Sequence, residues 1–132
     1  MKSIFNLFFL AVVILVSHYA SANQKEFKIN AEVIDYDPNK KIISLDGMIS
    51  VTSVDFQISG TTAMISMNEE VISIEGNPAK INLENPEKIF GEAKQIKYTL
   101  AKEISLAGEA VLKTPNGELR SKKILYQLGG SN

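Results

Sequence analysis

Apolar and polar residues alternate with a period of two over most of the sequence. Val54, Phe56 and Ile58, for example, share one parity, with Asp55 and Gln57 between them. Because successive side chains on a β-strand point to opposite faces, this pattern predicts strands with one buried face, on which all three apolar residues lie. The same alternation recurs in Ile43–Val51, Ile72–Glu75, Ala79–Leu83, Ile96–Leu100, Ile104–Leu112 and Ile124–Leu128. No stretch of helical period is long enough to compete with it.

Turn-forming residues separate these runs. The clearest turns are Asp37-Pro38-Asn39-Lys40, Asn85-Pro86-Glu87 and Thr114-Pro115-Asn116-Gly117, where Pro, Asn and Gly favour reversal of the chain. Short strands with a turn roughly every 8–12 residues are typical of an all-β sandwich, jelly roll or barrel.

Three glycines recur at similar intervals. Gly47, Gly76 and Gly108 are 29 and 32 residues apart, and each follows an aliphatic residue by two positions. A glycine inside a strand indicates a bulge or a close approach of another chain segment. A period near 30 residues is typical of stacked repeats, whose end strands stay available for pairing with another copy.

The composition excludes several functional classes. The 132 residues suffice for one domain, and the formal net charge of −1 argues against a dedicated nucleic-acid binder. There is no cysteine, and the only histidine is His18, which lies in an N-terminal segment that we expect to be cleaved off. Without these side chains most catalytic triads and most metal sites are excluded, so we expect neither an enzyme nor a bound metal or cofactor.

The first 22 residues have the pattern of a cleavable secretory signal. Lys2 gives a basic start, Ile4–Val16 is apolar apart from Asn6, and Ala20-Ser21-Ala22 is a small-residue cleavage site. The apolar run is shorter than the roughly 20 residues of a transmembrane helix. The sequence therefore predicts a signal peptide over 1–22 and one domain over 23–132, with an uncleaved membrane anchor as the alternative.

Several segments carry a resemblance to a known family. Ile74–Ile81 is similar to the Gly-x-Pro-Ala segment of the LptA/OstA family, the periplasmic proteins that carry lipopolysaccharide between the membranes of Gram-negative bacteria. Gly91–Lys102 with Leu106–Ala110 resembles the family's next unit, Phe27–Glu32 its first strand and Lys122–Tyr126 its last unit. The resemblance covers nearly all of the chain after residue 22.

The resemblance implies a twisted, open β-jelly roll of consecutive antiparallel strands, located in the periplasm. Its apolar interior would hold the acyl chains of lipid A during transport from the inner to the outer membrane. It also implies head-to-tail self-association, and partners in both membranes that carry similar β-jelly-roll domains. Each acyl CH₂ buried in such an interior gains about 0.8 kcal/mol, so lipid can be held without any catalytic group.

Candidate lipid-binding residues follow from the resemblance and from the strand faces. Phe27, Ile29 and Ile81 fall at lipid-facing positions of the family, in its first strand and just after Pro-Ala. The alternation places four further residues on the same interior: Ile43, Leu45, Phe56 and Tyr98.

Charge is divided unevenly along the chain. Residues 23–87 hold 11 acidic and 5 basic side chains, whereas residues 88–132 hold 4 acidic and 8 basic ones. The basic part contains candidate contacts for lipid phosphates: Lys94, Lys97, Arg120, Lys122 and Lys123. Opposite charge at the two ends would also favour head-to-tail order, although a solvated surface explains the same asymmetry.

Other interpretations stay open. An ordinary filled core produces the same alternation, so a non-enzymatic adaptor that binds only protein remains an alternative to a carrier. A membrane-anchored member of the same transport pathway is another. Asp35, Asp37 and Asn39 partly match a calcium loop, but Lys40 replaces its required glycine, so an Asx-capped turn is expected.

Overall fold

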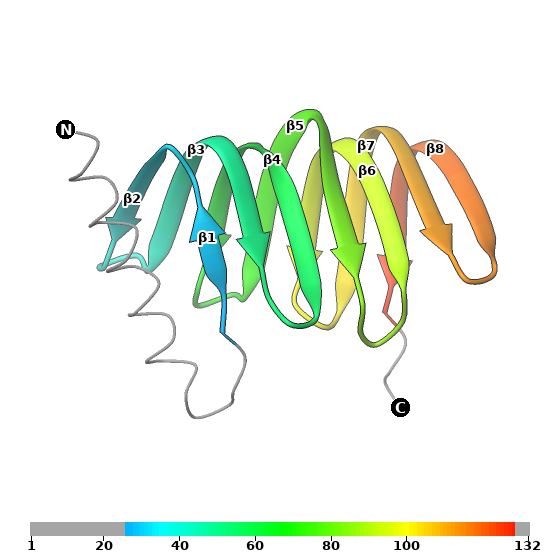
Figure 1. Cartoon of the computed structure of the whole chain (residues 1–132), viewed down its shortest axis with the longest axis horizontal. Coiled ribbons are helices and arrows are strands. Elements are labelled where there is room, and N and C mark those ends of the chain that lie inside the picture. The colour runs from blue at the N-terminus through cyan, green and yellow to red at the C-terminus, as the bar shows by residue number, and fades with distance from the viewer. Residues whose placement is uncertain (1–25, 129–132) are drawn as a thin grey trace.

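The computed structural model describes residues 26–128, which form one antiparallel sheet of eight strands (Figure 1). The strands are β1 (Lys28–Asn30), β2 (Val33–Asp37), β3 (Ile42–Thr52), β4 (Phe56–Ser66), β5 (Val71–Leu83), β6 (Ile89–Thr99), β7 (Glu103–Thr114) and β8 (Gly117–Gln127). From β3 to β8 each strand pairs with its neighbours in sequence, and β1 and β2 both pair with β3. The predicted all-β fold of consecutive antiparallel strands in an open sheet is confirmed.

The long strands bend near their middles, where the pairing register shifts. Gly47 (φ +85°) and Gly108 (φ +89°) lie in the left-handed region at the bulges of β3 and β7, and Gly76 lies at the bulge of β5. A Cβ atom at Gly108 would lie 2.8 Å from Cβ of Lys94, so glycine is needed there for space as well as for conformation. The predicted bulges at the recurring glycines are confirmed.

The bends fold the sheet into two layers that face each other (Figure 1). Layer 1 contains β1, the C-terminal half of β3 that pairs with it, and the halves of the later strands that continue this pairing. Layer 2 contains β2, the N-terminal half of β3 and the other halves of the later strands. We call the row of bends the bend edge and the opposite edge, where the hairpin tips lie, the seam. Layer 1 contributes the tips 53–55, 84–88 and 115–116, and layer 2 the tips 38–41, 67–70 and 100–102.

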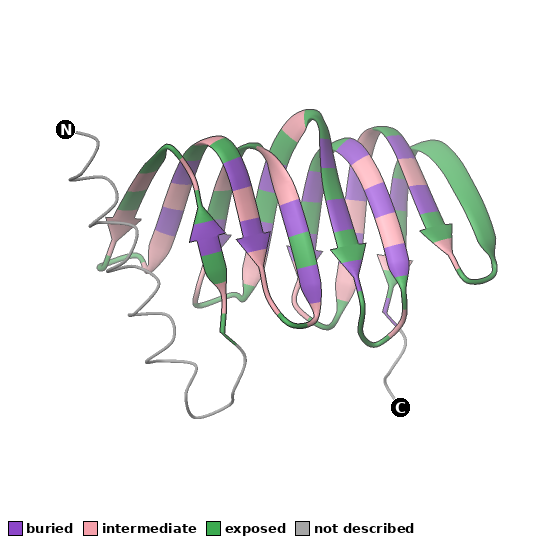
Figure 2. Ribbon diagram, viewed as in Figure 1, coloured by how far each residue is buried: buried purple, intermediate pink, exposed green. Residues whose placement is uncertain are grey.

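Inward side chains of both layers form one apolar core (Figure 2). The largest of its fully buried residues are Ile29, Ile43, Val51, Ile58, Ile72, Ile74, Ile81, Leu83, Ile96, Ile104, Leu106 and Leu112. Full burial of one such side chain contributes about 1.5–3 kcal/mol, so the space between the layers is the main source of stability.

Two local predictions have different outcomes. The turn at residues 37–40 is confirmed as Asx-capped, because Oδ1 of Asp37 accepts hydrogen bonds from the backbone N–H groups of Asn39 (2.9 Å) and Lys40 (3.2 Å). The expectation that Val54 shares a buried face with Phe56 is wrong. Val54 lies in the turn before β4 and is 73% exposed, because the chain reverses there before the strand begins.

The predicted signal segment, residues 1–22, lies outside the described residues. Within residues 26–128, no helix has the length and apolar character needed to cross a membrane.

Candidate functional site

The seam joins the two layers without a backbone ladder. In layer 2, the backbone N–H of Met67 donates to the carbonyl of Lys41 (3.0 Å), which joins two neighbouring tips. In layer 1, the N–H of Glu84 donates in the same way to the carbonyl of Asp55 (2.7 Å). Among residues 26–128, the backbone hydrogen bonds between tips all join tips of the same layer. The seam can therefore open without the loss of a strand pairing.

The apolar residues predicted to line the interior come together between the layers. Six are at most 4% exposed: Ile29, Ile43, Leu45, Phe56, Ile81 and Tyr98. Phe27 is half-buried and packs against the same core. Ile29 and Ile81 share one register row of layer 1, with Val51 and Ile58 between them. Contact of these seven residues with lipid stays a prediction.

The centre of the interior is filled by the protein's own side chains. Gly91 of β6 is buried in layer 1, and a Cβ atom there would lie 3.0 Å from Cγ2 of Ile81. The same atom would lie 3.3 Å from Cδ1 of Leu106, which belongs to layer 2. The two layers thus meet closely at Gly91, and an acyl chain requires them to separate or their side chains to move.

Three aromatic rings form a row that crosses the seam. The rings of Phe27 and Phe56 pack edge to face with centroids 5.7 Å apart. Phe56, at the start of β4 in layer 1, packs in the same way on Tyr98, at the end of β6 in layer 2 (5.1 Å). These ring contacts join the two layers, and acyl chains are able to take the place of one ring against another.

A polar contact crosses the seam farther along the chain. The hydroxyl of Tyr126, on β8 in layer 2, donates to Oε2 of Glu87 in the β5–β6 tip of layer 1 at 2.8 Å. This hydrogen bond raises the pKa of Tyr126 above its usual 10.0, and burial and the nearby carboxylate charge raise it further. Sequence reasoning placed Tyr126 on a strand face and Glu87 in a turn, and no signal connected them.

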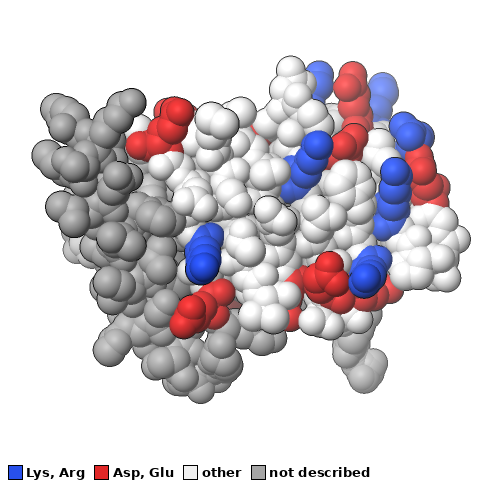
Figure 3. Space-filling model, in the orientation of Figure 1, with Lys and Arg blue, Asp and Glu red and all other residues white. Residues whose placement is uncertain are grey.

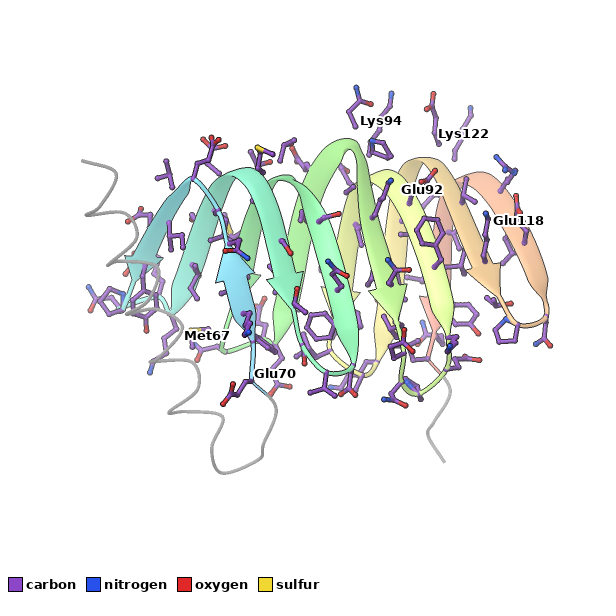
Figure 4. All side chains as sticks on the ribbon, in the orientation of Figure 1. Met67, Glu70, Glu92, Lys94, Glu118 and Lys122 are labelled. Carbon is purple, nitrogen blue, oxygen red and sulfur yellow. The ribbon has the colours of Figure 1, made fainter. Side chains whose placement is uncertain are left out.

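The five basic residues predicted to contact phosphates lie in three places. Lys94 and Lys122 project at the bend edge, opposite the tip that holds Met67 and Glu70 (Figure 4). On the face in Figure 3, basic side chains gather mainly over the C-terminal strands. Arg120 is exposed on β8, where its Nε donates to Oε2 of Glu118 at 2.6 Å.

Lys97 and Lys123 lie on the outer face of layer 2, on β6 and β8. Both border an open hollow of about 520 Å³. The other residues around it are Thr62, Ala63, Met64, Ser73, Ile74, Glu75, Gln95, Ile96, Ser105 and Ala107. None of the five predicted phosphate contacts lies in a seam tip, and their role with phosphate stays a prediction.

Within residues 26–128, the C-terminal end of the interior is not covered by another strand. Leu119 of β8 pairs with Leu112 of β7, so both lie in the same inward row of layer 1. Leu112 is fully buried, whereas Leu119 is 50% exposed. Within the described residues β8 pairs with β7 alone, so it presents an unpaired strand edge beside an uncovered apolar side chain.

Comparison with known proteins rests on structure. No family model matches the sequence, and no curated protein matches it. A solved structure does match: LptH from Pseudomonas aeruginosa, described as the LptA-homologous periplasmic component of the conserved lipopolysaccharide transport device. It aligns with a TM-score of 0.67 over 77% of this chain and 76% of its own. The fold is LptA-like.

The likeness to LptH confirms the fold that the sequence resemblance implied. The two sequences are only 18% identical, so the LptA-like fold is what the comparison shows.

Proposed function

We propose that this protein is a periplasmic carrier or bridge subunit that binds lipopolysaccharide and shields the acyl chains of lipid A between its two layers. The observation that carries this proposal is an apolar interior, in an LptA-like fold, that is closed along one edge by side chains and not by a strand ladder. The function requires no catalytic step and no cofactor, and none is proposed.

Binding is driven by the transfer of acyl chains from water into the space between the layers. At about 0.8 kcal/mol for each CH₂, a few buried methylenes replace the contact energy lost when the aromatic row separates. The bend edge stays joined by continuous strands, so it acts as the hinge while the seam widens. Ile29, Ile43, Leu45, Phe56, Ile81 and Tyr98, with Phe27 beside them, then face the lipid.

The headgroup stays outside the interior, because within the described residues no charged side chain is buried in the core. The proposed phosphate contacts are the five basic residues named above. Lys97 and Lys123 border the same hollow, so they are placed to act on one headgroup.

Transfer between carriers uses the open end of β8. Its unpaired edge is able to accept a strand from a second copy or from a similar β-jelly roll of the inner or outer membrane. Leu119 would be covered in such a contact, and the two apolar interiors would become continuous.

Lipid extraction and mass analysis of the protein purified from its own periplasm tests the proposal. We expect an acylated glycolipid to be recovered. Photo-crosslinking residues at Ile29 and Ile81 should capture it, whereas the same group at Met48, which is 79% exposed and belongs to neither set of proposed lipid contacts, should not. Absence of glycolipid from both the extract and the crosslinks would contradict the carrier function. Sequencing the N-terminus of the same sample separates a cleaved chain, starting at Asn23, from an anchored one, starting at Met1.

The close packing around Gly91 favours a second candidate, a protein-binding adaptor with a filled core. An adaptor should lose its partner when the β8 edge is blocked, and lipid should make no difference to it. Equal partner binding with and without added lipopolysaccharide, together with no lipid in the extract, would select this function.

A further inference from the structure

Side-chain contacts close the seam at two places. The row of Phe27, Phe56 and Tyr98 closes it by apolar contact. Farther toward the C-terminal end, the hydrogen bond between Tyr126 and Glu87 closes it by polar contact. This hydrogen bond joins β8, the last strand, to the β5–β6 tip. Its two residues lie 39 positions apart in the sequence.

The ring of Tyr126 covers the interior at this point. Tyr98, Ile104 and Tyr126 occupy one inward register row of layer 2, and Tyr98 and Ile104 are buried. Tyr126 is only half-buried, and its hydroxyl reaches over to layer 1. It therefore stands where the closed interior gives way to the open end marked by Leu119.

We propose that Tyr126 and Glu87 form a latch that holds the C-terminal end of the seam shut, and that release of this latch admits acyl chains. This inference rests on the proposed lipid-carrying function and names the residues that control entry to its site.

Opening at this place breaks one side-chain hydrogen bond. Both partners of the hydrogen bond are half-buried, so water replaces the bond when it breaks and neither group is left unpaired in an apolar space. Within residues 26–128, β8 pairs with β7 alone, so its end is able to move away from layer 1 without the loss of a strand pairing.

The neighbouring residue gives a matched control. Nε2 of Gln127 donates to Oε1 of Glu103 at 3.0 Å, which joins β8 to β7 within layer 2. Like the latch, this bond joins a side chain near the end of β8 to a glutamate carboxylate, but it does not cross the seam. A change at Gln127 therefore disturbs the end of β8 without releasing the two layers.

Loading kinetics test the latch. The probe is fluorescently labelled hexa-acylated lipid A, mixed in a stopped-flow instrument with the purified domain. Because a hydrogen bond to a charged group shifts an equilibrium by about tenfold, Tyr126→Phe should load about five- to tenfold faster than the original protein. Glu87→Gln should fall between the two, and Gln127→Ala should load at the original rate. Circular dichroism of each variant verifies that the fold is kept.

A covalent crosslink across the seam tests the latch in the opposite direction, by preventing its release. The chain has no cysteine, so Glu87→Cys with Tyr126→Cys creates a single reactive pair. Bridging this pair with a short bifunctional thiol reagent should block loading, and the unbridged double variant should load at least as fast as Tyr126→Phe. Equal loading by the original protein and Tyr126→Phe, or normal loading by the bridged protein, would overturn the latch alone. Failure of the original protein to take up lipid A would overturn both the latch and the carrier function.

Discussion

Phe56 of layer 1 packs edge to face on Tyr98 of layer 2, with ring centroids 5.1 Å apart and ring planes at 71°. The two residues come from opposite layers, so their contact exists only while the seam is shut. In the closed protein it stabilises the fold. If acyl chains enter, the same two rings become part of the surface that receives them, and stability and binding then depend on one pair of side chains.

Replacement of Phe56 by alanine should destabilise the protein by about 3–5 kcal/mol, because a buried ring is lost and a cavity remains. Chemical denaturation monitored by circular dichroism measures the change. Val54→Ala is the control, since Val54 is two residues away and 73% exposed, and it should change stability by no more than about 0.5 kcal/mol. Similar losses for both variants would contradict the close packing at the seam.

Replacement of Gly108 by alanine should destabilise the fold by about 1–2 kcal/mol, because the residue adopts φ +89°. The added Cβ also meets the stem of Lys94, which must move. Thermal unfolding measures the effect. An unchanged melting temperature would mean that the bend of β7 does not depend on this conformation.

The Tyr126–Glu87 hydrogen bond should give a distinct pH dependence. The pKa of Tyr126 in the folded protein lies above the usual 10.0. The stabilisation by this bond is therefore complete below about pH 10 and is lost as the pH rises through the raised pKa. The difference in unfolding free energy between the original protein and Tyr126→Phe should therefore be constant from about pH 6 to 9 and vanish at higher pH. Gln127→Ala should show no such loss. A difference that persists unchanged through the alkaline range would exclude the hydrogen bond as its source.

Leu119→Lys should weaken self-association at least tenfold, because it places a charge on the uncovered apolar position at the end of β8. Sedimentation velocity over a range of protein concentrations measures this. Leu125→Lys is the control, since Leu125 is also exposed but lies on the outward parity of β8. Equal association of the two variants would argue against contact through the open end.

Strand positions were predictable because burial alternates with a period of two within each half of a bent strand, although the buried parity switches at the bends of β4, β5 and β6. Residues 93–95 include good helix formers, yet Ile96 and Tyr98 mark a strand face, and the whole segment lies in β6. Val54 was misplaced because the alternation continues unbroken through a turn that has no Gly or Pro to mark it.

The seam contacts were not predictable, because they depend on how the two layers close over each other. Nothing in the spacing of Glu87 and Tyr126 indicates that a turn residue meets a strand residue. The basic residues illustrate the same limit: Lys122 and Lys123 are adjacent in sequence, yet one projects at the bend edge and the other borders the outer hollow.

The tips of layer 2 repeat one connection along the molecule. The carbonyl groups of Lys41, Glu70 and Lys102 accept the backbone N–H groups of Met67, Leu100 and Leu128 in turn. These acceptors are 29 and 32 residues apart, the same intervals as the recurring glycines. Each two-strand unit thus donates one backbone N–H to the unit before it and accepts one from the unit after it. A unit added or removed leaves both neighbours intact, so such a protein changes length in whole steps of about 9–10 Å, by duplication or loss of a gene segment and not by growth of its loops.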